Sequence, residues 1–256
     1  MAEGQGKTDG RMSLGEHLEE LRHRLILALA GLGVTLVVGL MLGKSLVALV
    51  RLPYEVAMGT DAGLAVLSVT AGLMVYLKVS LIAAVVLAAP WVFYQLWMFV
   101  AAGLYPPERR YVVLAVPMSA GLFICGALFF LLVVAVPVLK FFIFFSNWMH
   151  LELVVTFANH VSMMVNMMVV FGIGFQTPLA VLLLAKMGVV TQSGLRRYRR
   201  HVIVAVLIVA MLTTPPDPFS QLSLAVPMWL LYELGVLLVR IFVVEPTGDQ
   251  EDTISS

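Results

Sequence analysis

Long runs of hydrophobic residues, separated by short polar stretches, dominate the pattern along the chain. Six of these runs predict membrane-spanning helices, because each is apolar and ends at Pro-, Gly- or charge-rich segments. The predicted spans cover residues 25–50, 77–100, 112–136, 160–184, 202–212 and 221–239. The fifth run is shorter than the roughly 20 residues that a helix needs to cross a bilayer of about 30 Å. The pattern therefore predicts an all-α, polytopic membrane protein with six transmembrane helices.

Composition supports the membrane class and argues against several others. Hydrophobic residues make up 61% of the 256 positions and charged residues 12%, a balance unlike that of soluble domains. A net charge of +1 gives no reason to expect a nucleic-acid partner. His150, Glu152 and His160 lack metal-ligand spacing, and the chain has neither a phosphate loop nor a nucleophile elbow. We therefore expect no metal, no cofactor and no enzymatic activity.

The distribution of lysine and arginine predicts the orientation. Twelve of the 16 basic residues lie before the first span, after the last, or in the loops after the second and fourth. The other four are Lys44, Arg51, Lys78 and Lys140. The positive-inside rule then places both termini in the cytoplasm. The predicted organisation is a cytoplasmic tail over residues 1–24, a transmembrane domain over 25–243 and a second cytoplasmic tail over 244–256.

The segment Glu16–Leu25 (EHLEELRHRL), directly before the first span, carries an unusual concentration of acid. Leucines at helical spacing predict an amphipathic helix, and Glu16, Glu19 and Glu20 place carboxylates on its wet face. Acidic side chains gain little from a membrane surface that is itself anionic. The segment is therefore better suited to a basic partner than to lipid headgroups.

A further carboxylate, Glu108, lies in the turn over residues 103–111 (GLYPPERRY) on the same predicted side as Glu20. Taken alone, Glu108 is most simply a solvated acid that pairs with Arg109 or Arg110. Together, Glu20 and Glu108 could each bind a guanidinium through paired hydrogen bonds. Because lysine cannot reproduce that geometry, the two carboxylates predict a site that selects arginine.

A few polar and small residues lie inside the predicted spans. Gln176 lies about 15 Å and Glu233 about 10 Å from the nearest basic end of its span, by helical rise. Gln176 either stabilises helix contacts or has a functional role, and Glu233 is either a structural partner for a cytoplasmic-side base or a functional contact. Gly39 and Gly43 form a GxxxG pair, which is weak evidence for close helix packing.

The Pro-rich turn between the last two spans carries its own polar cluster. Asp217 followed by Pro218 is a typical start signal for a helix, with Asp at the N-cap. Thr213, Thr214 and Gln221 either bind a partner helix or satisfy backbone carbonyls freed by the prolines.

Five segments, taken in order, resemble the TatC family, the membrane-embedded receptor subunits of the twin-arginine protein translocase. They are EHLEELRHRL, APWVFYQLWMFVAAGLYPPERR (residues 89–110), GIGFQTPLAVLLLAKMGVV (172–190), LTTPPDPFSQ (212–221) and PMWLLYELGV (227–236). The resemblance runs from about residue 13 to residue 243. It implies a six-helix, N-in/C-in, concave glove-like bundle in the cell (inner, cytoplasmic) membrane, in contact with lipid.

The resemblance also implies function and partners. Folded precursors would be recognised through the paired arginines of their signal peptides and exported with TatA and TatB, driven by the proton-motive force. The receptor would form an oligomer with copies of itself. The implied signal-peptide-binding residues are Glu20, Glu108, Arg22 and Arg109. The implied partner-helix contacts are Met211, Thr214 and Gln221, and the implied functional positions on the outer side are Pro53 and Asp217.

Two departures and two rivals accompany this interpretation. The family often has glutamate where this chain has Gln176, so a mechanism that needs a titrating carboxyl there does not apply. The segment 67–72 also lacks the Pro-Thr-Glu-like run expected at the end of the first outer loop.

The first rival is a small-molecule or ion transporter that uses Glu233 and Gln176, and it predicts uptake by vesicles that contain this chain alone. The second is a purely structural assembly scaffold, a role that loss of partner assembly with intact signal-peptide binding would separate from reception.

Overall fold

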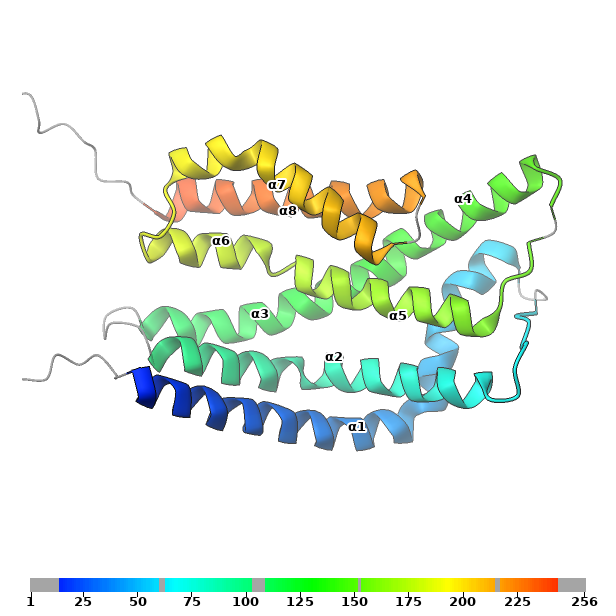
Figure 1. Cartoon of the computed structure of the whole chain (residues 1–256), viewed down its shortest axis with the longest axis horizontal. Coiled ribbons are helices and arrows are strands. Elements are labelled where there is room, and N and C mark those ends of the chain that lie inside the picture. Colours follow the sequence, from blue (N-terminus) through cyan, green and yellow to red (C-terminus); the bar gives the residue numbers. More distant parts are fainter. Residues whose placement is uncertain (1–13, 60–62, 103–108, 152, 215–216, 244–256) are drawn as a thin grey trace, which may run out of the picture. The chain divides into compact units, whose positions relative to one another are not determined.

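A computed structural model describes residues 14–59, 63–102, 109–151, 153–214 and 217–243. Within these ranges the chain forms six helical rods and no β-strand, which confirms the all-α prediction (Figure 1). The rods are α1 (Leu14–Met58); α2 (Ala71–Ala102); α3 (Arg109–Phe129) with the π-helix η1 (Phe130–Val134) and α4 (Ala135–Trp148); α5 (Phe157–Gly174) with α6 (Thr177–Lys186); α7 (Gln192–Thr213); and α8 (Pro218–Phe242).

Five of the six rods in the described ranges are long and apolar enough to cross a membrane, so the chain is a multi-pass membrane protein. The exception is α7, whose first half carries Arg196, Arg197, Arg199 and Arg200 and leaves only a short apolar second half. That division agrees with the short fifth run in the sequence. The amphipathic segment before the first span is not a separate helix, because α1 runs without a break from Leu14 to Met58.

Two helices extend well past the ends of their predicted spans. The third rod continues to Trp148 instead of ending at residue 136, because its last apolar, aromatic stretch keeps helical geometry through α4. The wider turns of η1 end three residues before Pro137, whose missing N–H would otherwise interrupt a regular α-helical ladder. Similarly, α1 extends past residue 50 to Met58 and includes Pro53. The helices thus include residues 51–58 and 137–148, which the predicted spans left outside.

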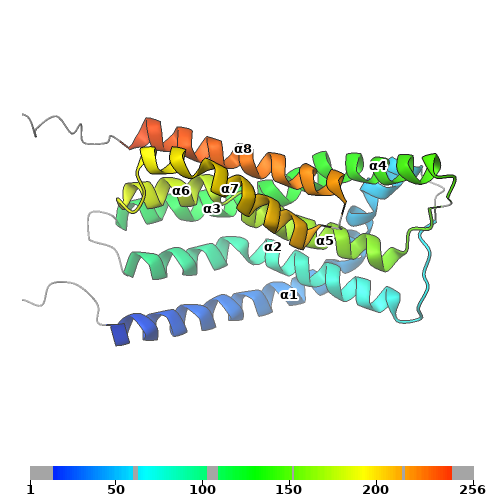
Figure 2. The same ribbon diagram turned by 45° about the horizontal axis from the view of Figure 1, so that its top comes forward.

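The chain divides into two compact units, residues 1–172 and 173–256. In unit 1, α1 and α2 run antiparallel, side by side in both views (Figures 1 and 2). The GxxxG pair of α1 lies in this contact, as its spacing suggested. A Cβ atom added at Gly39 would lie 2.4 Å from the backbone oxygen of Ser80, and one added at Gly43 would lie 2.3 Å from the Tyr76 ring.

Hydrogen bonds from side chains to backbone carbonyls also join α1 to α2 across this interface. The Thr35 hydroxyl donates to the Ala84 carbonyl at 3.0 Å, and the Trp91 indole donates to the Leu27 carbonyl at 2.9 Å. The Tyr76 hydroxyl donates to the carbonyl of Leu40. Inside a membrane such bonds add to close packing, because lipid offers no competing partner. The α1–α2 pair is therefore the best-connected part of unit 1.

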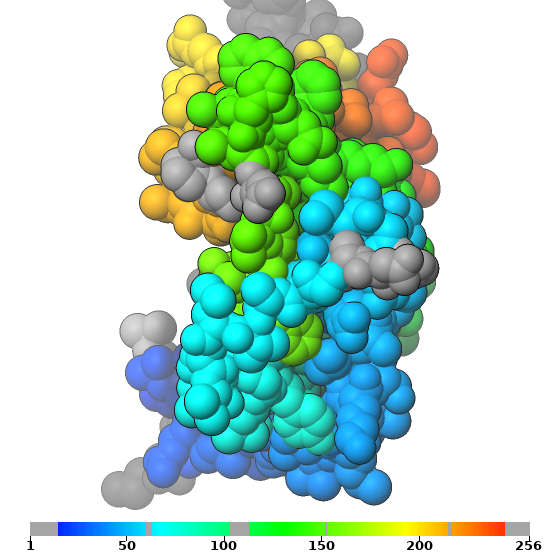
Figure 3. Space-filling model, turned by 90° about the vertical axis from the view of Figure 1, so that its right-hand side faces the viewer, coloured from blue at the N-terminus to red at the C-terminus, as the bar shows by residue number. Residues whose placement is uncertain are grey.

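At the far end of unit 1, α1 changes direction before it ends (Figure 1), and its last part contains Pro53, whose side chain is buried. Proline cannot donate to the preceding turn of a helix. His160 contacts this part of α1: its Nε2 donates to the carbonyl of Val50 at 3.1 Å, and its ring meets Tyr54 edge-on. Nearby, an isolated bridge joins Ala65 to Thr156. This end faces the viewer in Figure 3.

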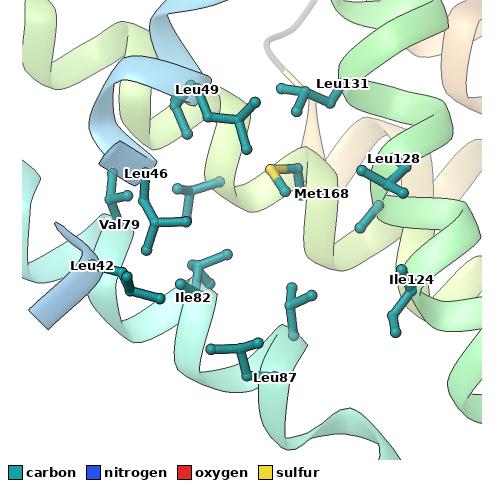
Figure 4. A pocket seen from close by; sticks show the side chains of 15 residues that line it. Leu42, Leu46, Leu49, Val79, Ile82, Leu87, Ile124, Leu128, Leu131 and Met168 are labelled. Carbon is teal, nitrogen blue, oxygen red and sulfur yellow. The ribbon is translucent and has the colours of Figure 1, made fainter. Parts of the chain in front are cut away.

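Unit 1 also contains an apolar groove of about 180 Å³ between α1, α2, α3, η1 and α5 (Figure 4). Leucines of α1, including Leu42 and Leu46, line one side, and Ile124 and Leu128 of α3 line the other. Met168 of α5 completes this part of the wall. Since all the lining side chains are hydrocarbon or thioether, the groove is suited to hydrocarbon.

Unit 2 is held together by a small core between α6, α7 and α8. Its buried residues are Val181, Ala185, Leu195, Tyr232, Val236 and Val239. Gly235 lets α8 approach α6 closely, since a Cβ atom there would lie 3.1 Å from the Cα of Pro178. The Tyr232 hydroxyl donates to the carbonyl of Leu195 at 2.7 Å and so ties α8 to α7.

Replacing Tyr232 with phenylalanine is expected to lower the free energy of unfolding by about 1 kcal/mol, because a buried hydrogen bond is lost at almost constant volume. Thermal unfolding in detergent measures the change. The matched control is Tyr198→Phe on α7, where the ring is 58% exposed and little change is expected. Equal effects of the two substitutions would contradict the role given to the Tyr232 hydroxyl.

Candidate functional site

The candidate site lies at the end of unit 1 where α1 begins and α2 ends, and it is built around Glu20. The Arg24 guanidinium donates from Nε to Oε1 of Glu20 at 2.7 Å, one helical turn away. The same guanidinium donates from Nη1 to Oε1 of Gln95 on α2 at 3.1 Å. The side chains of Glu20 and Arg24 are 25% and 20% exposed. Glu20 is therefore held in place while its carboxylate stays open to solvent.

The helix arrangement explains why these three residues meet. Glu20 and Arg24 are four residues apart on α1, so they share one helical face. Because α2 runs antiparallel to α1, its C-terminal half brings Gln95 to that face. Gln95 is only 2% exposed. A buried amide needs hydrogen-bond partners, and Arg24 provides one.

A hollow of about 150 Å³ adjoins this network. It is lined by Arg24 and Gln95 together with apolar side chains from both helices, namely Leu21, Leu25, Ala28, Val92, Leu96 and Phe99. The ring of His17 stacks on Phe99, with centroids 4.5 Å apart. The end of unit 1 thus combines a carboxylate, a guanidinium and an apolar depression.

The structure gives less information on the three other residues predicted for this site, Glu108, Arg109 and Arg22. Glu108 lies outside the described residues; it directly precedes Arg109, the first residue of α3. Because α3 packs against α2 and begins at Arg109, this residue lies at the end of unit 1 where α2 ends. Arg22 is exposed and forms no ion pair within the described ranges, so the residue that α1 brings to Glu20 is Arg24. Arg22 is two positions after Glu20, so on a helix the two side chains point to nearly opposite faces.

Sequence reasoning did not single out Arg24 or Gln95. The spacing of Glu20 and Arg24 is a recognised helix-stabilising pattern and could have indicated the pair. Gln95 had a weaker signal, as one amide within an apolar run (FYQLW). Its role depends on the contact between α1 and α2, which no local pattern reveals.

In unit 2, Glu233 forms an ion pair with Arg199 of α7, with Oε2 and Nη2 2.7 Å apart. Its other oxygen, Oε1, is buried and makes no hydrogen bond within the described residues. Gln176 lies elsewhere in the unit, as the N-cap residue of α6 directly before Thr177 and Pro178. The carboxylate of Glu233 is thus joined to Arg199, a base of α7.

At the turn between α7 and α8, the predicted helix start at Asp217 is confirmed. Asp217 is the N-cap residue of α8, and its Oδ1 accepts a hydrogen bond from the backbone N–H of Ser220 at 2.7 Å. The Thr214 hydroxyl donates to the Ala210 carbonyl at 2.9 Å, and the Gln221 amide donates to the Leu207 carbonyl at 3.1 Å. Both side chains therefore satisfy carbonyls near the end of α7. Met211 is 57% exposed.

These features define a class: a multi-pass, helical membrane protein with a hydrogen-bonded charged network where α1 begins and α2 ends. The family described as Sec-independent protein translocase protein (TatC) matches residues 16–227, so the chain belongs to the TatC family. It is a translocase subunit of the Sec-independent protein translocation system. Its relatives are named as translocase components, which is a transport class and not an enzyme class.

Individual relatives cover nearly the whole chain. The chain is 32% identical over 237 residues to the Sec-independent protein translocase protein TatC of Desulforapulum autotrophicum, covering 93% of this chain and 87% of the relative. It is 32% identical over 239 residues to TatC of Helicobacter pylori strain J99, covering 93% of each. A crystal structure of the twin-arginine translocase receptor TatC superposes with a TM-score of 0.79 at 29% identity, over 88% of this chain and 98% of that one.

Proposed function

We propose that this chain is the receptor subunit of a twin-arginine translocase and that it binds the paired arginines of signal peptides through Glu20 and Glu108. The observation that carries the proposal is the Glu20–Arg24 pair. The carboxylate of Glu20 already accepts a guanidinium N–H at 2.7 Å in a half-buried position. A signal-peptide arginine offers the same chemical group to the same acceptor.

Glu20 has capacity for a further guanidinium. Arg24 contacts only Oε1, and Oε2 forms no hydrogen bond within the described residues. An incoming arginine either engages Oε2 or replaces Arg24 at Oε1, while Arg24 retains its bond to Gln95. The binding would select arginine, because the planar guanidinium matches a carboxylate with two parallel bonds and an ammonium does not.

The second arginine of the pair is assigned to Glu108. This residue belongs to the segment 103–108, which links the end of α2 to the start of α3 at the same end of unit 1 as Glu20. The apolar hollow beside Arg24 would take an apolar side chain that flanks the arginine pair. The basic residues of the loops favour the cytoplasm for this end, in line with the positive-inside rule.

The remaining parts of the proposal concern partners. Export would be driven by the proton-motive force and would require TatA, TatB and further copies of this chain. The end of α7 is the proposed contact for a partner helix in the membrane, because Met211 and Leu212 are 57% and 75% exposed there. Thr214 and Gln221 would then support this contact by fixing the end of α7, since their polar groups bond to its carbonyls.

A comparison of two signal peptides tests the proposal. The full-length chain in lipid nanodiscs should bind a labelled twin-arginine signal peptide about 100-fold more tightly than the same peptide with both arginines changed to lysine. Each lysine loses about one charge-assisted hydrogen bond of roughly 1.5 kcal/mol, and two such losses correspond to that factor. Fluorescence anisotropy measures both affinities. Equal affinity for the two peptides would refute arginine selection at this site.

A further inference from the structure

The start of α7 carries arginines whose charge is not balanced by acid. Arg199 is paired with Glu233. Arg196, Arg197 and Arg200 are all exposed, and none of them forms an ion pair within the described residues. Within the described part of the chain, three guanidinium groups over five residues therefore stand without an acidic partner.

The same face of α7 continues as an exposed apolar stripe. Val204 is seven residues after Arg197 and four after Arg200, and Ile208 follows after another four, so helical spacing aligns them. Val204 is 55% and Ile208 49% exposed. One face of α7 therefore presents guanidinium groups above a strip of hydrocarbon.

This arrangement is complementary to one particular molecule. In a membrane, the change from arginine to apolar residues on α7 lies where headgroups meet acyl chains. Guanidinium groups bind phosphate oxygens through paired hydrogen bonds, and Val204 and Ile208 offer contact to an acyl chain. A small soluble anion would use only the guanidinium groups.

We propose that this face of α7 binds an anionic phospholipid, with the headgroup phosphate at Arg197 and Arg200, supported by Arg196, and an acyl chain along Val204 and Ile208. The proposal does not depend on signal-peptide binding, which is assigned to unit 1. It gives the Sec-independent translocase subunit a second ligand, drawn from the membrane itself.

The chain contains one rival occupant. Residues 244–256 carry Glu245, Asp249, Glu251 and Asp252. They follow the end of α8, which lies at the same end of unit 2 as the start of α7, since Leu195 bonds to Tyr232 and Arg199 to Glu233. These acids could neutralise the same arginines, so the experiment includes a chain that ends at Val243.

The experiment titrates the purified full chain in detergent with palmitoyl-oleoyl phosphatidylglycerol or phosphatidylcholine and counts bound lipids by native mass spectrometry. The unmodified chain should prefer phosphatidylglycerol. The variant Arg197→Gln/Arg200→Gln should bind it about 30-fold more weakly, because each basic residue near an anionic lipid contributes about fivefold in affinity. The matched control Lys44→Gln/Lys140→Gln removes two exposed cations elsewhere and should retain the preference.

Each other outcome overturns the proposal. Equal loss in the test and control variants would mean that binding follows net charge and not this face. A preference that appears only in the chain ending at Val243 would assign the arginines to the acidic tail. Competition by glycerophosphoglycerol, which has the headgroup without acyl chains, at concentrations equal to the lipid would indicate a site for soluble phosphate. Thermal unfolding of each variant verifies that its fold is retained.

Discussion

Replacing Glu20 with glutamine is expected to weaken binding of a twin-arginine signal peptide by about 100-fold, because the peptide guanidinium loses two charge-assisted hydrogen bonds of roughly 1.5 kcal/mol each. Glutamine keeps the size of the side chain, but it removes the charge and replaces one acceptor oxygen with an NH2 donor, which cannot accept from a guanidinium. Export of a twin-arginine precursor into membrane vesicles should decrease together with the affinity for the signal peptide. The affinity is measured by fluorescence anisotropy with the full chain in nanodiscs.

The matched control is Glu19→Gln, the neighbouring carboxylate, which is exposed and forms no ion pair within the described residues. It removes the same charge from the same turn of α1 and should leave the affinity within about twofold, because an exposed charge contributes little. The double variant Glu20→Gln/Glu108→Gln should bind no more tightly than Glu20→Gln alone. Binding at the unmodified level in this double variant would eliminate both carboxylates as the receptor site.

Stability separates a binding defect from misfolding in these variants. The Glu20–Arg24 pair is partly exposed and joins residues one turn apart, so its loss should cost less than about 1 kcal/mol. Arg24 also keeps Gln95 as a partner. Glu20→Gln should therefore unfold at nearly the same temperature as the unmodified chain, and a large drop would show that Glu20 acts through the fold.

Replacing Gly39 with alanine is expected to lower the free energy of unfolding by about 2–3 kcal/mol, because overpacking forces tightly packed elements apart. The added Cβ atom would lie 2.4 Å from the Ser80 carbonyl oxygen of α2. That atom belongs to the backbone and cannot rotate away. The two helices must separate, which also weakens the bonds from Thr35 and Trp91 across the interface.

Gly33 on the same helix is the matched control. Nothing lies within 4 Å of a Cβ atom added there. Gly33→Ala should leave stability unchanged or raise it by up to about 1 kcal/mol, through the better helix propensity of alanine. Thermal unfolding followed by tryptophan fluorescence compares the two variants in one detergent. If both substitutions shifted the unfolding temperature in the same direction by the same amount, this result would contradict a close α1–α2 contact at Gly39.

The parts of the fold that the sequence predicted correctly depend on local patterns. Apolar runs indicated the helices, Asp217–Pro218 indicated the start of α8, and Gly39 with Gly43 indicated a close helix contact. The end of the third rod was missed because the predicted boundary relied on Pro137. Proline normally marks a break, and here it follows the π-helical turn of η1 within one continuous rod.

The candidate site shows the limit of that reasoning more clearly. Glu20 was identified from charge and position, but its partners Arg24 and Gln95 were not. Gln95 is separated by 71 residues from Arg24 along the chain, and only the antiparallel contact of α1 with α2 brings them together. The sequence predicted that Glu233 either pairs with a basic residue or has a functional contact. The packing of α7 on α8 determines that its basic partner is Arg199.

The uneven lengths of the helices have a consequence for the surrounding bilayer. The third rod has an apolar stretch of 36 residues, or about 54 Å, whereas the second half of α7, over residues 202–213, extends only about 18 Å. A hydrocarbon layer of about 30 Å matches neither length. The long rod must tilt or protrude, and the bilayer beside α7 must thin unless another helix covers it, each at a cost of a fraction of a kcal/mol per ångström. The fold thus builds elastic strain into the membrane next to the short apolar half of α7, and an incoming segment that relieves this strain gains affinity without any specific contact.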